Sequence, residues 1–312
     1  MSSPDFVTTF NKMHMDDAYE ATRKHLQDAP ELAARFDAIA IVVNQVLPET
    51  VPSDLPRLTK PGFFPYAEAG TDAALALTLA HHGAYKTAYF HLRAFFELHL
   101  ITVYFLSPEV SEVKAREWLR SREMTPFFKT VLKTLFNEPV FSAADTALAL
   151  QERLKSFYYR TSDIIHTRGE RNSNVALAYS NLPRFIPETF EQFAHDAEDA
   201  LSLVITCLAL RSPVIMVPLP LFQKCGFNPP LSGFLEKEEV AALHAFLDDK
   251  SLAFLETVAA ADGFTQGAKQ HFEGLPDITE EKLQQQMKYQ KEILHDMSRR
   301  RHVESDGNSG AD

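Results

Sequence analysis

The stretch YKTAYFHLRAFFELHLITVYFL, residues 85–106, decides the fold. Its apolar side chains fall at nearly every angle around a helix, which is typical of a helix that is buried on most sides. The segments around it repeat apolar residues at helical spacing, and none alternates as a strand would. The composition, with 11 glycines against 24 phenylalanines, also favours helices over a turn-rich β fold. We therefore predict an all-α protein, a helical bundle built around this segment.

Proline and capping residues predict where the other helices begin. Ser107 and Ser142 are assigned to helix starts, because a hydroxyl that accepts from backbone N–H groups is favoured there. Ser142 is expected to open one long helix, with Asp145 in its first turn. The expected helices are residues 16–47 with a second start at Pro30, residues 71–80, one opened at Ser107, residues 125–136, 142–166, 187–211, 236–249, 251–261 and 279–301.

Changes in composition divide the chain into four expected parts. They are N-terminal helices with a proline-rich connector (1–64), the helical bundle (65–212), a smaller C-terminal helical appendage (213–301) and a disordered tail (302–312). The tail is assigned from its polar, charged composition.

The charge and cysteine content limit the classes of function. A net charge of −11 counts against a broad nucleic-acid-binding surface, although residues 110–171 hold eleven Lys or Arg against eight Asp or Glu. The most apolar run, residues 201–222, is broken by one arginine and three prolines, so no membrane span is expected. Only Cys207 and Cys225 are present, and residues 1–12 lack an export pattern, so we expect a cytoplasmic protein.

The clearest candidate for chemistry is Arg160, followed after five residues by His166, at the end of a predicted helix. A projection at about 100° per residue puts both on the polar face, together with Tyr159, Ser162 and Asp163. Asp163 lies three residues from each and could contact either side chain. A cation, an imidazole and a carboxylate on one face are the groups needed for proton transfer next to a phosphate. The pattern also fits a solvated helix face with an Arg160–Asp163 pair.

A second candidate lies inside the central segment, where Arg93 and Glu97 are one helical turn apart. A buried charge needs a partner, because an isolated one would cost several kcal/mol. The two side chains could simply pair with each other, or they could lie beside Arg160 and His166 and tune the imidazole. The chain contains no phosphate-binding glycine loop, no nucleophile elbow and no metal-ligand spacing, so no cofactor and no metal are expected.

Residues 92–98 (LRAFFEL) and 159–166 (YRTSDIIH) together resemble the HEPN superfamily. These small helical bundles include many bacterial toxin and defence ribonucleases, and their signature is an Arg, four to six residues and a His at the end of a long helix. The resemblance covers about residues 65–212. It implies a homodimer whose two Arg/His pairs meet at a shared cleft, with RNA as the substrate. It also implies metal-independent cleavage by the 2′-hydroxyl, and an antitoxin or sensor protein as a further partner.

The resemblance assigns roles only to matching positions. His166 would act as general base or acid, and Arg160 would hold the phosphate and offset its developing charge. The supporting positions on the same face are Asp163, Ser162 and Tyr159. On a straight helix Arg160 and His166 are about 120° and 9 Å apart, so they are expected to share a cleft most simply across a dimer. The residue after the arginine is usually Asn, Asp or His in active members, whereas here it is Thr161, which the projection turns toward the core.

Three functions remain open from the sequence. The leading prediction is a HEPN-like, metal-independent endoribonuclease in phage defence or toxin-type growth control. The alternative is a non-catalytic helical binding or scaffold module that keeps Arg160 and His166 as a pocket or as plain surface. The third is an enzyme that acts on a small metabolite through the charges at Arg93 and Glu97.

Overall fold

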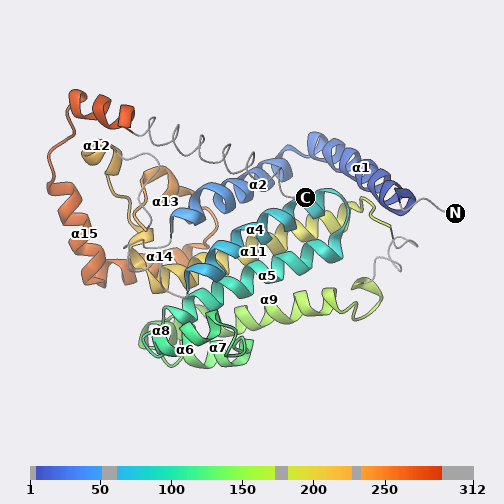
Figure 1. The fold of residues 1–312 in the computed structure, drawn as a ribbon, viewed down its shortest axis with the longest axis horizontal. Coiled ribbons are helices and arrows are strands. Elements are labelled where there is room, and N and C mark those ends of the chain that lie inside the picture. Colours follow the sequence, from blue (N-terminus) through green and yellow to red (C-terminus); the bar gives the residue numbers. More distant parts are fainter. Residues whose placement is uncertain (1–4, 51–61, 173–181, 227–232, 290–312) are drawn as a thin grey trace, which may run out of the picture.

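The structure is a computed structural model of the chain, and it describes residues 5–50, 62–172, 182–226 and 233–289 (Figure 1). Within these ranges the secondary structure is helical, apart from one isolated bridge between Pro218 and Leu235. The prediction of an all-α helical bundle is confirmed. The predicted disordered tail, residues 302–312, lies outside the described residues.

The bundle is centred on α5 (Tyr85–Phe105), which packs against α4 (Phe63–His81), α9 (Leu150–Ile165) and α11 (Pro187–Arg211). Figure 1 shows α4, α5 and α11 side by side, with α9 along the outer side of α5. Large aromatic side chains on α5 are almost fully buried: Tyr85, Tyr89, Phe95, Phe96 and Tyr104. Burial of their apolar area is the main favourable contribution to the fold.

The turn from α4 to α5 depends on Gly83. Its φ is +70°, and a Cβ placed there would lie 2.5 Å from the backbone of Arg184. Only glycine allows both the left-handed conformation and this close approach. The turn thereby joins the two central helices to the segment that leads into α11.

The remaining helices surround this centre. α6, α7 and α8 gather at one end of the bundle (Figure 1). Their bounds, with those of the other helices, are α1 (Asp5–Asp28), α2 (Pro30–Ile41), α6 (Glu112–Leu119), α7 (Phe128–Leu135), α8 (Pro139–Leu148), α12 (Leu221–Cys225), α13 (Lys237–His244), α14 (Asp249–Ala261) and α15 (Gly263–Gly274). Residues 280–289 are also helical, and the rest of the predicted helix 279–301 lies outside the described part of the chain.

The prediction that Ser107 starts a helix is wrong. α6 begins after Ser111, whose side chain accepts from the backbone N–H of Lys114. Ser107 is buried, and its hydroxyl donates to the carboxylate of Glu138 at 2.7 Å. The same hydroxyl oxygen also accepts from the backbone N–H of Glu109 at 3.1 Å, so Ser107 stabilises a local turn before α6 and not the start of a helix.

The predicted single helix over residues 142–166 is two helices. They are separated by Ala149, which has a left-handed φ of +51°. Asp145 accepts from the N–H of Gln151 at 2.8 Å, so it caps the second helix instead of starting the first. The break turns the chain so that α9 runs back along α5 in the opposite direction, and this brings Ser162 to Arg93.

A buried ion pair ties the end of α11 to the start of α8. Arg211 donates to both oxygens of Glu138, at 2.7 and 2.8 Å, and Ser107 donates to the same carboxylate. Burial by itself would raise the pKa of Glu138, but the hydrogen bonds from Arg211 and Ser107 outweigh burial and lower it below its usual value. The charged form is thus favoured in the fold.

We predict that Glu138→Gln lowers the free energy of unfolding by about 3 kcal/mol at pH 7, because it leaves the buried Arg211 charge without a carboxylate. A carboxyl group with a lowered folded pKa stabilises the fold above its unfolded pKa of about 4.3, and this stability is lost as the pH falls through the folded pKa. The difference between Glu138→Gln and wild type should therefore shrink at pH 3.5. Urea unfolding at both pH values measures it, with the exposed Glu123→Gln as control.

Candidate functional site

The polar face predicted for α9 divides between two neighbouring helices. Arg160 lies toward α11, where it meets Asp196 and Asp199. Ser162 lies toward α5, where it accepts a hydrogen bond from Arg93. The two positions are about 160° apart around the helix, so they cannot face the same neighbour.

Arg160 is held by two carboxylates. Its Nη2 lies 2.8 Å from Asp196, whose side chain is fully buried, and 2.7 Å from Asp199, which is 40% exposed. Tyr89 donates to the other oxygen of Asp196 at 2.6 Å. The Nε of Arg160 is buried without a hydrogen-bond partner. One positive charge therefore faces two negative ones, and the cluster does not favour an additional anion such as a phosphate.

The buried groups of this cluster have shifted pKa values. Burial raises the pKa of Asp196, while the hydrogen bond from Tyr89 and the charge of Arg160 act in the opposite direction. Burial, together with the nearby Asp196 charge, raises the pKa of Tyr89 well above its usual value. Tyr89 therefore remains a protonated donor, and the positive charge of Arg160 favours the ionised form of Asp196.

Sequence reasoning missed Asp196, Asp199 and Tyr89. Asp196 left a signal, because it is a carboxylate among the buried positions Phe193 and Ala197 of α11. A charge on the apolar side of a helix calls for a cation from a neighbouring element. The spacing of residues within α11 does not indicate which cation from another helix will pair with Asp196.

The second cluster surrounds Arg93 on α5. Its Nε donates to Glu97 at 2.5 Å, its Nη1 donates to Ser162 at 2.7 Å, and its guanidinium lies 4.2 Å from the ring centroid of Tyr158. The predicted pairing of Arg93 with Glu97 is thus present, and Arg93 also touches the polar face of α9. These contacts use two of the five N–H donors of the guanidinium, so donors remain for a ligand.

A pocket of about 280 Å³ opens beside Arg93. Its lining residues are Phe90, Arg93, Ala94, Glu97, Ile165 and His166. His166 is exposed and therefore accessible to a ligand. The structure thus brings together three of the predicted site residues, Arg93, Glu97 and His166, in this pocket. Arg160 is not among the lining residues of this pocket.

The position of His166 follows from the way α9 ends. The helix stops at Ile165, and Thr167 and Gly169 adopt left-handed φ values of +54° and +86°. Lys86 of α5 donates to the Thr167 hydroxyl at 2.9 Å, which fastens the end of the helix to α5. His166, the residue directly after the last turn of α9, is thereby held where it lines the pocket.

The other predicted supporting residues are placed elsewhere. Asp163 pairs with Arg168 at 3.3 Å, and no contact of Asp163 with Arg160 or His166 is seen among the described residues. Tyr159 is 61% exposed on the outer side of α9. Thr161 is fully buried, as its projected direction indicated, and its hydroxyl donates within its own helix.

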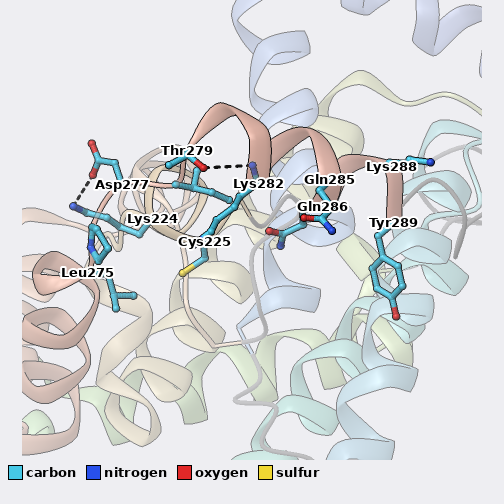
Figure 2. A pocket seen from close by; sticks show the side chains of 12 residues that line it. Lys224, Cys225, Leu275, Asp277, Thr279, Lys282, Gln285, Gln286, Lys288 and Tyr289 are labelled. Carbon is cyan, nitrogen blue, oxygen red and sulfur yellow. Dashed lines mark hydrogen bonds and ion pairs between the residues drawn. The ribbon is translucent and has the colours of Figure 1, made fainter.

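A larger cavity of about 860 Å³ lies between α12 and the helix at residues 280–289 (Figure 2). Lys224 there is already paired with Asp277 at 2.7 Å, and Lys288 points away from that pair. Burial raises the pKa of Cys225, which disfavours the reactive thiolate. No histidine is among the described residues that line the cavity. The cavity therefore has fewer groups for chemistry than the pocket at His166.

Comparisons with models of protein families, with curated proteins and with solved structures found no match to this chain. No cluster of three or more His, Cys, Asp or Glu that could hold a metal ion occurs among the described residues. Within the same ranges, no helix is long and apolar enough to cross a membrane. The pocket at His166 is therefore assigned as the candidate site from the arrangement of its residues alone.

We predict that Arg160→Met lowers the free energy of unfolding by about 2–3 kcal/mol at pH 7, because it leaves the buried Asp196 without its cation. The loss is below that of a fully buried pair because 38% of the Arg160 side chain is exposed. Removing the guanidinium should raise the folded pKa of Asp196 further. An acid with a raised folded pKa destabilises the fold as the pH rises above its unfolded value of about 3.9, so the loss should be smaller at pH 4.

Urea unfolding at pH 4 and pH 7 tests this prediction. The matched control is Arg168→Met, which removes an exposed arginine from a surface pair and should change stability by less than about 0.5 kcal/mol. Equal stability of Arg160→Met and wild type at pH 7 would contradict a structural role for the Arg160 cluster.

Proposed function

We propose that this protein is a HEPN-like, metal-independent endoribonuclease with a role in phage defence or toxin-type growth control. The observation that carries the proposal is the pocket that brings His166 together with Arg93 and Glu97. An accessible imidazole beside a guanidinium with free donors is suited to proton transfer next to a phosphate. The resemblance of residues 159–166 to the HEPN signature supports the same reading.

The proposed reaction uses the neighbouring 2′-hydroxyl of the RNA as the nucleophile. His166 takes the proton of this hydroxyl, and its oxygen attacks the adjacent phosphorus. The bond from phosphorus to the 5′-oxygen breaks, and that oxygen receives a proton from an acid on the opposite side. A second copy of the chain would supply this acid through its own His166. The products are a 2′,3′-cyclic phosphate and a 5′-hydroxyl.

Arg93 is the better candidate for the cation that holds the phosphate. It faces one carboxylate, Glu97, and keeps donors available, whereas Arg160 faces Asp196 and Asp199 and is compensated twice. Charge that develops on the phosphate oxygens would therefore be stabilised more at Arg93. Arg160 would act as a positioning residue that fixes α9 against α11 and so fixes the end that carries His166.

The second candidate function is a non-catalytic binding module. The specific observation in its favour is the double ion pair of Arg160, since the signature arginine is then engaged in the fold and Thr161 after it is buried. In this case the pocket at His166 would bind an anionic ligand without cleaving it. The two functions differ in whether RNA is cut.

We predict that His166→Ala lowers RNA cleavage by at least about 100-fold, because general acid–base catalysis typically contributes 10²–10⁴-fold. Stability should change little, because the side chain is exposed. Cleavage of total cellular RNA by wild type should persist in EDTA, because proton transfer and charge stabilisation come from side chains. His271→Ala, an exposed histidine on α15, is the matched control.

The outcome also separates the two functions. Cleavage products should carry 2′,3′-cyclic phosphate ends, and expression of wild type should arrest growth while His166→Ala should not. A wild-type protein that leaves a broad RNA panel intact and causes no growth arrest would favour the binding module.

We predict that Arg93→Lys lowers kcat by at least about 10-fold. A lysine cannot donate to Glu97, to Ser162 and to a phosphate in the fixed fork of a guanidinium. Arg160→Lys, which keeps one charge near Asp196, should reduce kcat less, once the fraction of folded protein is measured by circular dichroism. The opposite order of the two variants would assign the phosphate contact to Arg160.

A further inference from the structure

A second hollow adjoins the candidate site on the outer side of α9. It has a volume of about 530 Å³ and lies between α7 and α9. Its lining residues are Phe128, Lys129, Leu132, Lys133, Phe136, Asn137, Gln151, Lys155 and Tyr159. We call it the lysine groove.

The lysine groove is positively charged within an acidic protein. Lys129, Lys133 and Lys155 contribute three charges, and no Asp or Glu is among the described lining residues. None of these lysines forms an ion pair in the described part of the chain; Lys155 donates only to the amide oxygen of Gln151, at 2.7 Å. Elsewhere many surface cations are paired with carboxylates, as Arg116 is with Glu112. Three uncompensated lysines in one hollow favour an anionic ligand with several charges.

Aromatic contacts connect the lysine groove to the pocket at His166. Phe128 of the groove stacks on Tyr158 with ring centroids 4.0 Å apart and an interplanar angle of 5°. The guanidinium of Arg93, which lines the pocket, lies over the same Tyr158 ring. The Tyr158 ring thus contacts both Phe128, which lines the groove, and Arg93, which lines the pocket.

The two hollows also share one face of α9. At 100° per residue, Lys155, Tyr159, Ser162 and His166 lie within about 60° of one another. The distance along the helix from Lys155 to His166 is about 16 Å at 1.5 Å per residue. A chain of phosphates could therefore follow this face from the lysines to the imidazole.

We propose that the lysine groove binds the single-stranded RNA segment that flanks the phosphate held at His166. This inference rests on the proposed ribonuclease function and assigns its substrate as unpaired RNA. The lysines would contact successive phosphates, and Tyr159, 61% exposed at the edge of the groove, would stack on a base. Asn137 and Gln151 offer amide groups to base edges. A duplex keeps its base faces stacked inside, so it cannot use Tyr159 in this way.

The test measures binding separately from cleavage. The probe is a fluorescent single-stranded 12-mer of 2′-O-methyl RNA, which lacks the nucleophilic hydroxyl and cannot be cut by the proposed reaction. Fluorescence anisotropy at several salt concentrations gives Kd for wild type and for the triple variant Lys129→Gln, Lys133→Gln, Lys155→Gln. The matched control is Lys24→Gln, Lys237→Gln, Lys250→Gln, which removes three exposed lysines outside the groove.

The groove variant should bind more weakly than the control variant at each salt concentration. The slope of log K against log salt should become shallower by about 2, since each lost phosphate contact on a single strand contributes about 0.7. Tyr159→Ala should weaken binding by about 5- to 150-fold, the range for stacking of one base. A duplex of the same sequence should bind wild type more weakly than the single strand does.

The results separate this proposal from the proposed function. Binding that depends on the groove lysines, with no cleavage of ordinary RNA, would support the groove and overturn the ribonuclease. Equal Kd for the groove and control variants, or no binding of the probe by wild type, would overturn the groove even if RNA is cleaved. Loss of binding to vesicles of acidic phospholipid in the groove variant, with RNA binding unchanged, would also overturn it in favour of a membrane surface.

Discussion

The burial of α5 on most of its circumference is the constraint on which the rest of the structure depends. Side chains such as Phe95, Tyr104 and Phe105 point in different directions and are all buried. A single partner helix could cover only one of these directions, so α4, α9 and α11 must surround α5. The polar groups on α5 are then forced to find partners on those helices, because a buried polar group without one is costly.

The two arginines near α9 show how this requirement separates similar residues. Arg160 forms an ion pair with Asp196, a buried carboxylate on α11. Arg93 projects from α5 to the other flank of α9, where Glu97 and Ser162 take only part of its hydrogen-bonding capacity. The guanidinium charge is therefore compensated at Arg160, whereas the guanidinium of Arg93 still has donors available. The difference comes from the number of nearby carboxylates and not from the residue type.

The arrangement of charge gives an acidic protein one basic hollow beside its candidate site. The net charge of −11 argues against nucleic-acid binding over the whole surface, but it does not describe a single face. The hollow between α7 and α9 gathers three lysines with no carboxylate among its described lining residues. The binding of a short anionic ligand depends on the charges close to it, because salt screens charges that are more than about 8–10 Å away.

The sequence by itself determined the all-α class, the burial of the segment at residues 85–106 and the start of α11 at Pro187, because hydrophobic periodicity and proline act locally. It also determined the direction of Thr161, and it offered the pairing of Arg93 with Glu97, which lie within one helix, as one of two possible arrangements. Only the tertiary structure decided the break at Ala149, the use of Ser107 by Glu138 and the partners of Arg160. These features depend on residues from separate helices, and spacing within one helix carries no information about which neighbour will lie against it.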